Sequence, residues 1–511
     1  MNEKFDDSLE QRFVRIARAN WHKRCISDST GRNLTYCRTL ITAFAMAAKI
    51  KKTVGHNKVG IMLPPSVAAV LANLAATLAG KITVNLNYTT SAQARAFAIE
   101  HCQLDRVISS RKFLNRAGID EHNNKFVFVE DLAAEIRLGR MIKAYIKARF
   151  AKIKRVAADE TATIIFSSGT AGVPKGVMLT HSNILSNITA ILKVIKINSD
   201  DNLCGVLPFF HSFGFTCGLW LPLIAGASAA YAPKGLDAIE VGRQTHKNRS
   251  TILFAPPTFL SNYVKRTNKN DFATLRLVFA GAEKLRTQLA DDFELKFGLR
   301  PLQGYGATEL SPVVSLNLPS QNKQDTVGKA LPGVSIKIVD GQTCQTLEPG
   351  MTGLIMVKGP NVMAGYLNMQ KETLEVLKDG WYNTGDIGYL DDDGFLTVTD
   401  RLSRFSKIAG EMVPHTAVEQ VYLEALGIYE QAVAVTGIPD AKKGEELVVL
   451  YLPQAGTAEH LHEIIIKSNL PNICRPKRGN YIEINLMPTL GSGKLDIMEL
   501  RKIALAKLKD N

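Results

Sequence analysis

The chain has 511 residues, 46% of them apolar and 22% charged, which is the composition of a globular protein long enough for two or more domains. Its 62 basic and 48 acidic side chains give a net charge of +14, which favours anionic partners. No zinc finger, helix-turn-helix or aromatic and basic RNA-binding pattern occurs, so no nucleic-acid partner is expected. The seven cysteines form no CxxC pair, which argues against a zinc site and a disulfide framework.

The N-terminal segment is acidic and polar and lacks the apolar core of a signal peptide. Together with the scattered cysteines, this predicts a cytoplasmic protein. Further along, residues 59–63 and 81–86 have the pattern of short strands, and the alanine- and leucine-rich residues 67–79 between them predict a buried helix. A strand–helix–strand order implies parallel pairing in an α/β layer.

Residues 137–155 predict a basic amphipathic helix. Apolar side chains recur at helical spacing, and eight basic residues occur with no acid among them. Such a helix can lie on an anionic membrane surface, which would place the protein at the inner face of the cell membrane. A helix packed on the protein body with a solvated basic face is the alternative.

Residues 163–166 predict a strand that leads into a loop rich in glycine and hydroxyl groups. Glycines allow the backbone to turn tightly, and successive amide groups can form an anion-binding nest. The side chains add hydroxyl donors and one positive charge, so the loop predicts a phosphate-binding site formed by Ser167, Ser168, Gly169, Thr170, Ala171, Gly172 and Lys175. It is not a Walker A loop, because Pro174 stands where the second glycine would be and Gly176 follows the lysine.

Residues 202–233 contain no Lys, Arg, Asp or Glu. A membrane-spanning helix needs roughly 20 apolar residues, but prolines, glycines and His211 interrupt this run. A buried strand–loop–helix is therefore predicted. After about residue 400 the chain predicts a smaller α+β unit, with strands at 431–435 and 446–452.

Further motifs follow the loop in chain order, at 281–283 (GAE), 304–309 (GYGATE), 382–386 (YNTGD), 400–401 (DR) and 491–494 (GSGK). With the loop, this ordered set resembles the acyl-adenylate-forming superfamily of acyl-CoA synthetases, luciferases and adenylation domains. The resemblance covers essentially the whole chain. It implies an α/β fold in which a large N-terminal domain of αβ layers with a small β-barrel-like part (residues 1–400) precedes a small, mobile α+β C-terminal domain (residues 401–511).

The resemblance also implies a role for each motif in the ATP- and Mg²⁺-dependent activation of a carboxylate. The loop would cradle the β- and γ-phosphates, Thr170 and Glu309 would help to hold Mg²⁺, and Lys494 would neutralise charge as the acyl-adenylate forms. The nucleotide would also contact Gly281, Ala282, Glu283, Gly304, Tyr305, Gly306, Ala307 and Thr308, and its ribose would contact Asp386 and Arg401.

Residues 207–215 (LPFFHSFGF) match the aromatic and histidine motif beside the acyl site, so His211 is a candidate catalytic residue. A packed core histidine is the alternative, because four phenylalanines surround it in sequence. Amino-acid-activating members usually place an aspartate here, and its absence favours a plain carboxylic acid, such as a fatty acid.

Residues 304–315 and 401–413 resemble the synthetase half of 2-acylglycerophosphoethanolamine acyltransferase/acyl-[acyl-carrier-protein] synthetases. This implies transfer of a fatty acyl group to acyl carrier protein, with coenzyme A as the alternative acceptor. The acyltransferase half that normally comes first is not expected here. Ser403 departs from the Asp or Lys usual at the interdomain hinge, which makes Arg404 and Lys407 candidate carrier-protein or phosphate contacts. Amino-acid adenylation and a nucleotide-binding protein without turnover are the remaining alternatives.

Overall fold

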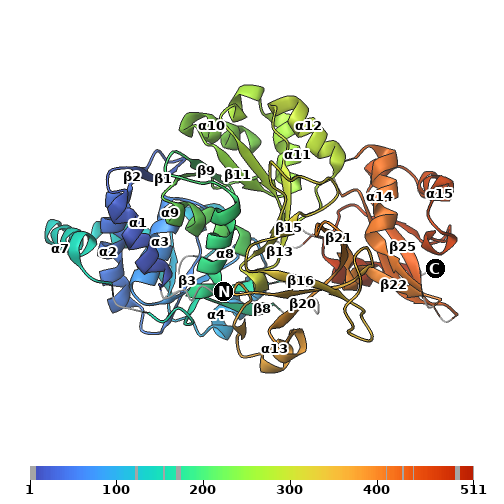
Figure 1. The fold of residues 1–511 in the computed structure, drawn as a ribbon, viewed down its shortest axis with the longest axis horizontal. Coiled ribbons are helices and arrows are strands. Elements are labelled where there is room, and N and C mark those ends of the chain that lie inside the picture. Colours follow the sequence, from blue (N-terminus) through green and yellow to red (C-terminus); the bar gives the residue numbers. More distant parts are fainter. Residues whose placement is uncertain are drawn as a thin grey trace. The chain divides into compact units, whose positions relative to one another are not determined.

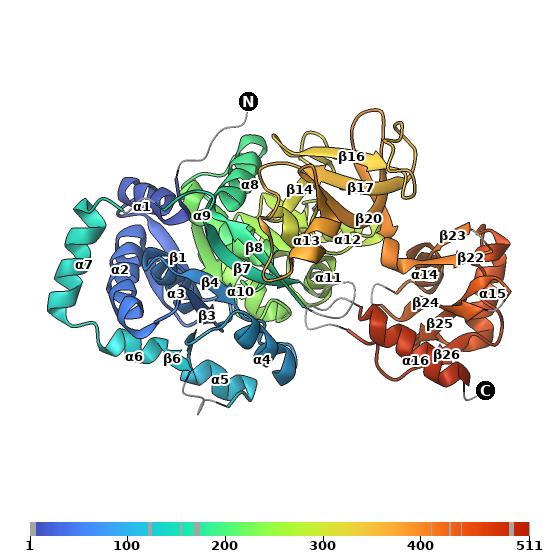
Figure 2. The same ribbon diagram turned by 90° about the horizontal axis from the view of Figure 1, so that it is seen from below.

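The computed structural model describes residues 7–120, 125–153, 156–167, 174–409, 411–428, 431–440, 442–489 and 495–509 (Figures 1 and 2). The chain divides into two compact units. Unit 1 comprises Met1–Ile336, Val357–Tyr382 and Gly394–Leu396, and unit 2 comprises Lys337–Met356, Asn383–Asp393 and Thr397–Asn511. The domain boundary expected after residue 400 stays a prediction.

Unit 1 contains a seven-stranded sheet with the strand order β18-β8-β7-β4-β3-β5-β6. The strands predicted at 59–63 and 81–86 are β3 and β4, which pair in parallel as expected. The predicted helix between them is α3 (Val67–Leu78), which starts where the Ser66 hydroxyl accepts a 3.2 Å hydrogen bond from the Ala69 amide. The strands of this sheet are β3 (Lys58–Ile61), β4 (Ile82–Asn85), β5 (Val107–Ser109), β6 (Phe126–Phe128), β7 (Thr161–Ser167), β8 (Lys175–Thr180) and β18 (Gly365–Tyr366).

Unit 1 also contains a nine-stranded sheet with the order β15-β14-β13-β12-β11-β9-β10-β1-β2. Its central strands are parallel and fully buried, as expected for a sheet covered on both faces. The strands are β1 (Arg24–Asp28), β2 (Asn33–Thr35), β9 (Asn202–Gly205), β10 (Ser228–Tyr231), β11 (Ile252–Ala255), β12 (Leu277–Ala280), β13 (Leu302–Gly306), β14 (Val313–Leu316) and β15 (Lys329–Ala330).

Helices connect and flank these strands (Figures 1 and 2). The other helices of unit 1 are α1 (Leu9–Ala19), α2 (Tyr36–Thr53), α4 (Ala92–His101), α5 (Arg111–Ala117), α6 (Val129–Ala134), α7 (Leu138–Phe150), α8 (His181–Val194), α9 (Leu221–Ala225), α10 (Ala238–Asn248), α11 (Pro257–Arg266), α12 (Thr287–Phe297) and α13 (Gln370–Val376). All seven cysteines are free thiols in this structure.

The uncharged segment 202–233 is buried inside unit 1, as predicted. It forms β9, a π-helix at Gly214–Trp220, α9 and β10. Among the helices that the structure describes, none is long and apolar enough to cross a membrane.

A third sheet has the order β16-β17-β20-β19, with β21 beside β20. Its strands are β16 (Ser335–Val339), β17 (Gly353–Lys358), β19 (Leu377–Lys378), β20 (Trp381–Leu390) and β21 (Leu396–Arg401). This sheet corresponds to the small β-barrel-like part that the family resemblance implied.

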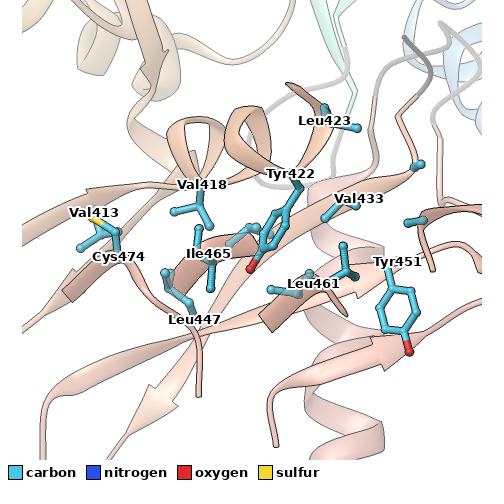
Figure 3. Packing of buried hydrophobic residues seen from close by; sticks show 14 of the residues in the cluster. Val413, Val418, Tyr422, Leu423, Val433, Leu447, Tyr451, Leu461, Ile465 and Cys474 are labelled. Carbon is cyan, nitrogen blue, oxygen red and sulfur yellow. The ribbon is translucent and has the colours of Figure 1, made fainter. Parts of the chain in front are cut away.

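The C-terminal part of unit 2 is the predicted α+β arrangement. Its sheet has the order β23-β22-β25-β24, with β26 beside β25. Its core packs residues of α14 and α15 on the strands (Figure 3), among them Tyr422 and Ile465, both fully buried. The elements are β22 (Phe405–Ile408), β23 (Glu411–Pro414), β24 (Val433–Asp440), β25 (Gly444–Tyr451), β26 (Tyr481–Glu483), α14 (His415–Leu426), α15 (Ala458–Lys467) and α16 (Ile497–Lys509).

Candidate active site

The loop predicted to bind phosphate joins β7 to β8, two antiparallel strands whose last and first residues, Ser167 and Lys175, are register partners. The hairpin thus fixes both ends of the loop. Several predicted residues lie outside the described part of the chain, so their roles stay predictions. They are Ser168, Gly169, Thr170, Ala171 and Gly172 in this loop and Lys494 near the C terminus.

Glu309 is the centre of the polar cluster beside this hairpin. Its side chain is buried, with a relative exposure of 8% for the residue. The Ser167 hydroxyl donates to Oε1 of Glu309 at 3.3 Å, and the Tyr366 hydroxyl donates to the same oxygen at 3.0 Å. Among the residues described, no basic side chain forms an ion pair with this carboxylate, so a buried negative charge faces hydroxyl groups only.

Two tyrosines complete the cluster. Burial, and then the negative charge of Glu309, raise the pKa of Tyr366, and the same two causes raise the pKa of Tyr382. Both hydroxyls therefore stay protonated at neutral pH, and Tyr366 remains a donor to Glu309. The Lys175 ammonium lies 4.8 Å from the centre of the Tyr366 ring, in a cation–π contact.

This donor set suits a hard divalent cation that is shared with a ligand. The described residues hold no group of three or more His, Cys, Asp or Glu that could form a complete metal cage. A magnesium ion does not need one, because it commonly takes one or two protein carboxylates and obtains its other oxygens from phosphates and water. Glu309 and the Ser167 hydroxyl are oxygen ligands that the described residues offer here.

The glycine-containing motifs lie together at one edge of the nine-stranded sheet. β12 and β13 are parallel neighbours, and they end directly before 281–283 and at 304–306. Carboxyl ends of parallel strands are where α/β proteins bind ligands. Ala282 has a φ of 72°, and at Gly306 an added Cβ would collide with the backbone oxygen of Pro312. Ala282 thus adopts a left-handed backbone conformation, and Gly306 lets the Pro312 backbone approach closely.

Glu283 is held by its neighbours. Its carboxylate accepts hydrogen bonds from the Thr258 amide at 3.1 Å and from the Thr258 hydroxyl at 2.6 Å. It thus joins the motif to the first turn of α11, which leaves the backbone of 281–283 as the part suited to a ligand.

The aromatic segment 207–215 contacts both of these motifs. A Cβ added to Gly281 would lie 3.2 Å from the Phe213 ring. The Ser212 hydroxyl donates to Thr308 Oγ1 at 3.2 Å. The ring of His211 is half-buried and lies 4.6 Å from the ring of Phe210, measured between centroids. Phe210 in turn meets Tyr88 edge-on at 5.0 Å. The structure thus places His211 in an aromatic surrounding, next to the motifs that are expected to bind nucleotide.

Unit 2 carries the two residues expected to contact a ribose. Nε of Arg401 lies 3.1 Å from Oδ1 of Asp386, whose side chain is 5% exposed, whereas that of Arg401 is 51% exposed. The Asp386 amide donates to the Thr384 hydroxyl at 3.0 Å, within strand β20. The two residues meet although 15 positions separate them in the sequence.

Arg404 is not a surface contact, contrary to expectation. It forms a buried ion pair with Glu419, which also accepts a 2.7 Å hydrogen bond from the Val435 amide. Burial raises the pKa of Glu419 although Arg404 opposes the shift. Arg404 therefore makes its contacts inside unit 2. Of the two candidate contacts, Arg404 and Lys407, only Lys407 is exposed.

Sequence reasoning missed Tyr366, whose hydroxyl touches Glu309. It belongs to the two-residue strand β18 and lies 57 positions from Glu309 in the sequence. Tyr366 belongs to none of the sequence motifs. The one hint in the sequence was that Tyr366 lies a short distance before the motif at 382–386.

Comparison with known proteins relates the chain to enzymes that bind AMP and to CoA ligases. A sequence model of a family described as "AMP-binding enzyme" matches residues 13–367. Probable 4-coumarate–CoA ligase 3 of Dictyostelium discoideum is 34% identical over 350 residues, which are 66% of this chain and 62% of that protein. A long-chain-fatty-acid–CoA ligase of Bacillus subtilis (strain 168) is 31% identical over 311 residues, 60% of this chain and 55% of that protein. The matches thus span less than two thirds of these relatives.

The solved structure of o-succinylbenzoate CoA synthetase from Bacillus subtilis, in complex with its acyl-adenylate intermediate, superimposes with a TM-score of 0.83 at 25% identity. The superposition covers 96% of this chain and 98% of that one. It confirms the predicted fold class, a mixed α/β protein with a larger N-terminal and a smaller C-terminal part.

Proposed function

The chain belongs to the AMP-binding enzyme family, and from this we propose that it is an ATP- and Mg²⁺-dependent ligase that activates a carboxylic acid and passes the acyl group to a thiol. In the first step a carboxylate oxygen bonds to the α-phosphorus of ATP, and the bond from that phosphorus to pyrophosphate breaks. In the second step the thiol sulfur bonds to the acyl carbon, and AMP leaves.

The observation that carries this proposal is the cluster around Glu309. It combines a buried carboxylate without a described cationic partner, the hydroxyl at the edge of the phosphate loop, and the ammonium of Lys175 close by. Bound Mg²⁺ would offset the charge of the phosphates and of the departing pyrophosphate. In this proposal Glu309 and Thr170 hold the ion, the loop from Ser167 to Lys175 holds the outer phosphates, and Lys494 neutralises charge at the α-phosphate.

The segment 207–215 supports an apolar acid as the substrate. His211 and the phenylalanines around it lie beside the nucleotide motifs, and the segment contains no acid that could pair with a substrate ammonium group. We therefore favour a long-chain fatty acid over an amino acid.

The acceptor that we propose is the thiol of a phosphopantetheine group, which acyl carrier protein and coenzyme A share. The net charge of +14 and the resemblance of 401–413 favour acyl carrier protein. The names of the relatives, which are CoA ligases, favour coenzyme A. Reacylation of lysophospholipid is a downstream use that this chain would share with a separate acyltransferase.

Fatty-acid-dependent exchange of labelled pyrophosphate into ATP tests the activation step. We expect exchange with wild type and a loss of roughly a hundredfold or more in Glu309→Gln and in Lys494→Ala, because each change removes charge stabilisation in the transition state. Glu375→Gln and Lys467→Ala, at exposed surface positions, serve as matched controls that should leave the rate unchanged. Absence of exchange across fatty acids of all chain lengths, or exchange driven by amino acids instead, would contradict the proposal.

Competition between the two acceptors decides the second step. Wild type is incubated with ATP, fatty acid, acyl carrier protein and coenzyme A together, and the two thioesters are separated. Acyl-[acyl-carrier-protein] as the main product would support our preference, and acyl-CoA as the sole product would make the chain an acyl-CoA synthetase.

A further inference from the structure

Helix α7 carries a stripe of large apolar side chains that point away from the protein. Its residues are between 46% and 78% exposed. On the opposite side Ala144 and Ala148 are buried, and this small-residue side lets α7 lie alongside α2 in both views (Figures 1 and 2). The stripe consists of Leu138, Ile142, Tyr145, Ile146 and Phe150. Isolated exposed apolar residues are common, but a contiguous row of this size marks an interaction surface.

The orientation of the stripe is fixed by contacts at its base. The Arg18 guanidinium donates to the carbonyl oxygens of Ala148 at 2.8 Å and Ala151 at 2.7 Å, which holds the last turn of α7 on α1. Trp21 meets Tyr145 edge-on at 6.2 Å and lies under the Arg149 guanidinium at 5.5 Å. The helix therefore cannot bury the stripe by rotating about its axis without losing these contacts.

Positive charge surrounds the stripe. The described basic residues on α7 and its flanks are Arg137, Arg140, Lys143, Lys147, Arg149 and Lys152, and the sequence from 137 to 153 contains no acid. The nearest acid in the sequence, Glu135, is already engaged by Lys49 at 2.7 Å and by Arg140 at 3.9 Å. An occupant of this surface must therefore offer both an apolar layer and negative charge.

We propose that α7 docks on the surface of an anionic lipid bilayer, with the helix parallel to the membrane plane. The stripe would enter the boundary between headgroups and acyl chains, and the basic residues would meet the anionic headgroups. Tyr145 and Trp21 suit this depth, because their rings are apolar with one polar atom. A second copy of the chain fits less well, because α7 packed on α7 would oppose two sets of cations.

Binding of the full-length protein to vesicles tests the proposal, and it requires no turnover, so its failure would leave the proposed ligase activity untouched. The vesicles are phosphatidylcholine alone or phosphatidylcholine mixed with an equal part of phosphatidylglycerol. Wild type should bind the mixed vesicles at least about tenfold more tightly than the neutral ones, and added salt should weaken this binding.

Two double variants separate the apolar and the charged contributions. Ile142→Gln/Ile146→Gln removes part of the stripe and should weaken binding about tenfold or more, with no loss of stability because both side chains are exposed. Lys143→Gln/Lys147→Gln should weaken binding to the mixed vesicles about tenfold and leave binding to neutral ones unchanged. Ile239→Gln, at another exposed apolar position on α10, is the control for the first variant.

The control for the charge variant is Lys442→Gln/Lys443→Gln, two exposed lysines of unit 2. Equal binding to neutral and anionic vesicles, or no binding to either, would overturn the proposal. So would self-association of wild type that Ile142→Gln/Ile146→Gln abolishes, because the occupant of the stripe would then be a second copy.

Discussion

At the scale of single residues, Tyr366 shows how the Glu309 site is organised. One side chain serves two charged groups, since its hydroxyl donates to the Glu309 carboxylate at 3.0 Å and its ring faces the Lys175 ammonium at 4.8 Å. A buried carboxylate needs such donors to offset the cost of removing it from water. The hydroxyl and the ring thus have separable roles.

Tyr366→Phe separates them, because phenylalanine keeps the ring for Lys175 and removes only the hydroxyl. A hydrogen bond to a charged group contributes about 1.5–3 kcal/mol. We therefore expect pyrophosphate exchange to fall about tenfold or more, and the Mg²⁺ concentration for half-maximal rate to rise. Tyr382→Phe is the matched control, because the Tyr382 hydroxyl is hydrogen-bonded to Tyr366, whereas the Tyr366 hydroxyl donates directly to Glu309. Identical losses in both variants, or none in Tyr366→Phe, would contradict this role.

The candidate residues that could be predicted from the sequence are those in contiguous motifs. Ser167 and Glu309 were both predicted, and the structure brings them within hydrogen-bond distance although 142 positions separate them. Tyr366 could not be predicted, because only the pairing of β18 with β8 carries it to the site. Arg404 was expected to contact a carrier protein or phosphate. Its ion pair with the buried Glu419 could not be predicted, because the sequence does not show which charged side chains meet in the fold.

At the scale of elements, α1 and α8 meet through a buried pair of titratable side chains. Burial raises the pKa of Glu10 to about 6 and lowers the pKa of His181 to about 4. His181 is therefore neutral at pH 7, and its Nδ1 accepts a hydrogen bond from the Leu9 amide at 3.2 Å. Oε2 of Glu10 lies 3.7 Å from that nitrogen and has no hydrogen-bond partner within the described part of the chain.

This arrangement predicts that Glu10 limits stability at neutral pH. A carboxyl whose pKa is raised on folding stabilises the fold below its unfolded pKa of 4.5, and that contribution is lost as the pH rises through 6. A shift of this size corresponds to about 2 kcal/mol. Glu10→Gln should therefore unfold at a higher temperature than wild type at pH 7, and the difference should vanish near pH 4.

Thermal unfolding of both proteins across this pH range provides the measurement. His181 contributes in the opposite sense, because its lowered pKa makes stability fall as the pH drops through 4, but this contribution is common to both proteins and cancels in the comparison. Exposed Glu100→Gln is the control and should show no pH-dependent difference. A constant offset between wild type and Glu10→Gln at all pH values would contradict the titration.

α7 shows which features of an element a sequence does not determine. Helical periodicity correctly predicted a helix within 137–155, and the structure has it at Leu138–Phe150. In most amphipathic helices the large apolar side chains pack against the protein. In the fold Ala144 and Ala148 take that place, because only small side chains allow α7 to come so close to α2. Which side of a helix is buried depends on its partner.

At the scale of the whole molecule, the chain divides into two compact units, and each carries some of the residues predicted to contact the nucleotide. Among the described residues, Ser167, Lys175 and Glu309 belong to unit 1, whereas Asp386 and Arg401 belong to unit 2. The order of the motifs was enough to predict the family, and the match over residues 13–367 confirms it. The domain boundary and the movement of the C-terminal domain stay predictions, because motif order carries no information on how compact units are delimited.

The role proposed for Lys494 predicts that this residue matters for only one half of the reaction. If Lys494 acts at the α-phosphate, its charge is needed while the acyl-adenylate forms, and it has no role once pyrophosphate has left. Lys494→Ala should then lose acyl-adenylate formation by roughly a hundredfold or more. Supplied with synthetic acyl-adenylate, the same variant should transfer the acyl group to the thiol acceptor at nearly the wild-type rate.

Single-turnover measurements of each half-reaction test this separation. Lys467→Ala, an exposed lysine of unit 2, is the control and should behave as wild type in both. Equal loss of both half-reactions in Lys494→Ala would mean either that the residue acts in both steps or that the change disturbs the fold. Circular dichroism of the variant distinguishes these two cases. Loss of transfer alone would place Lys494 at the thiol step and reverse the assignment.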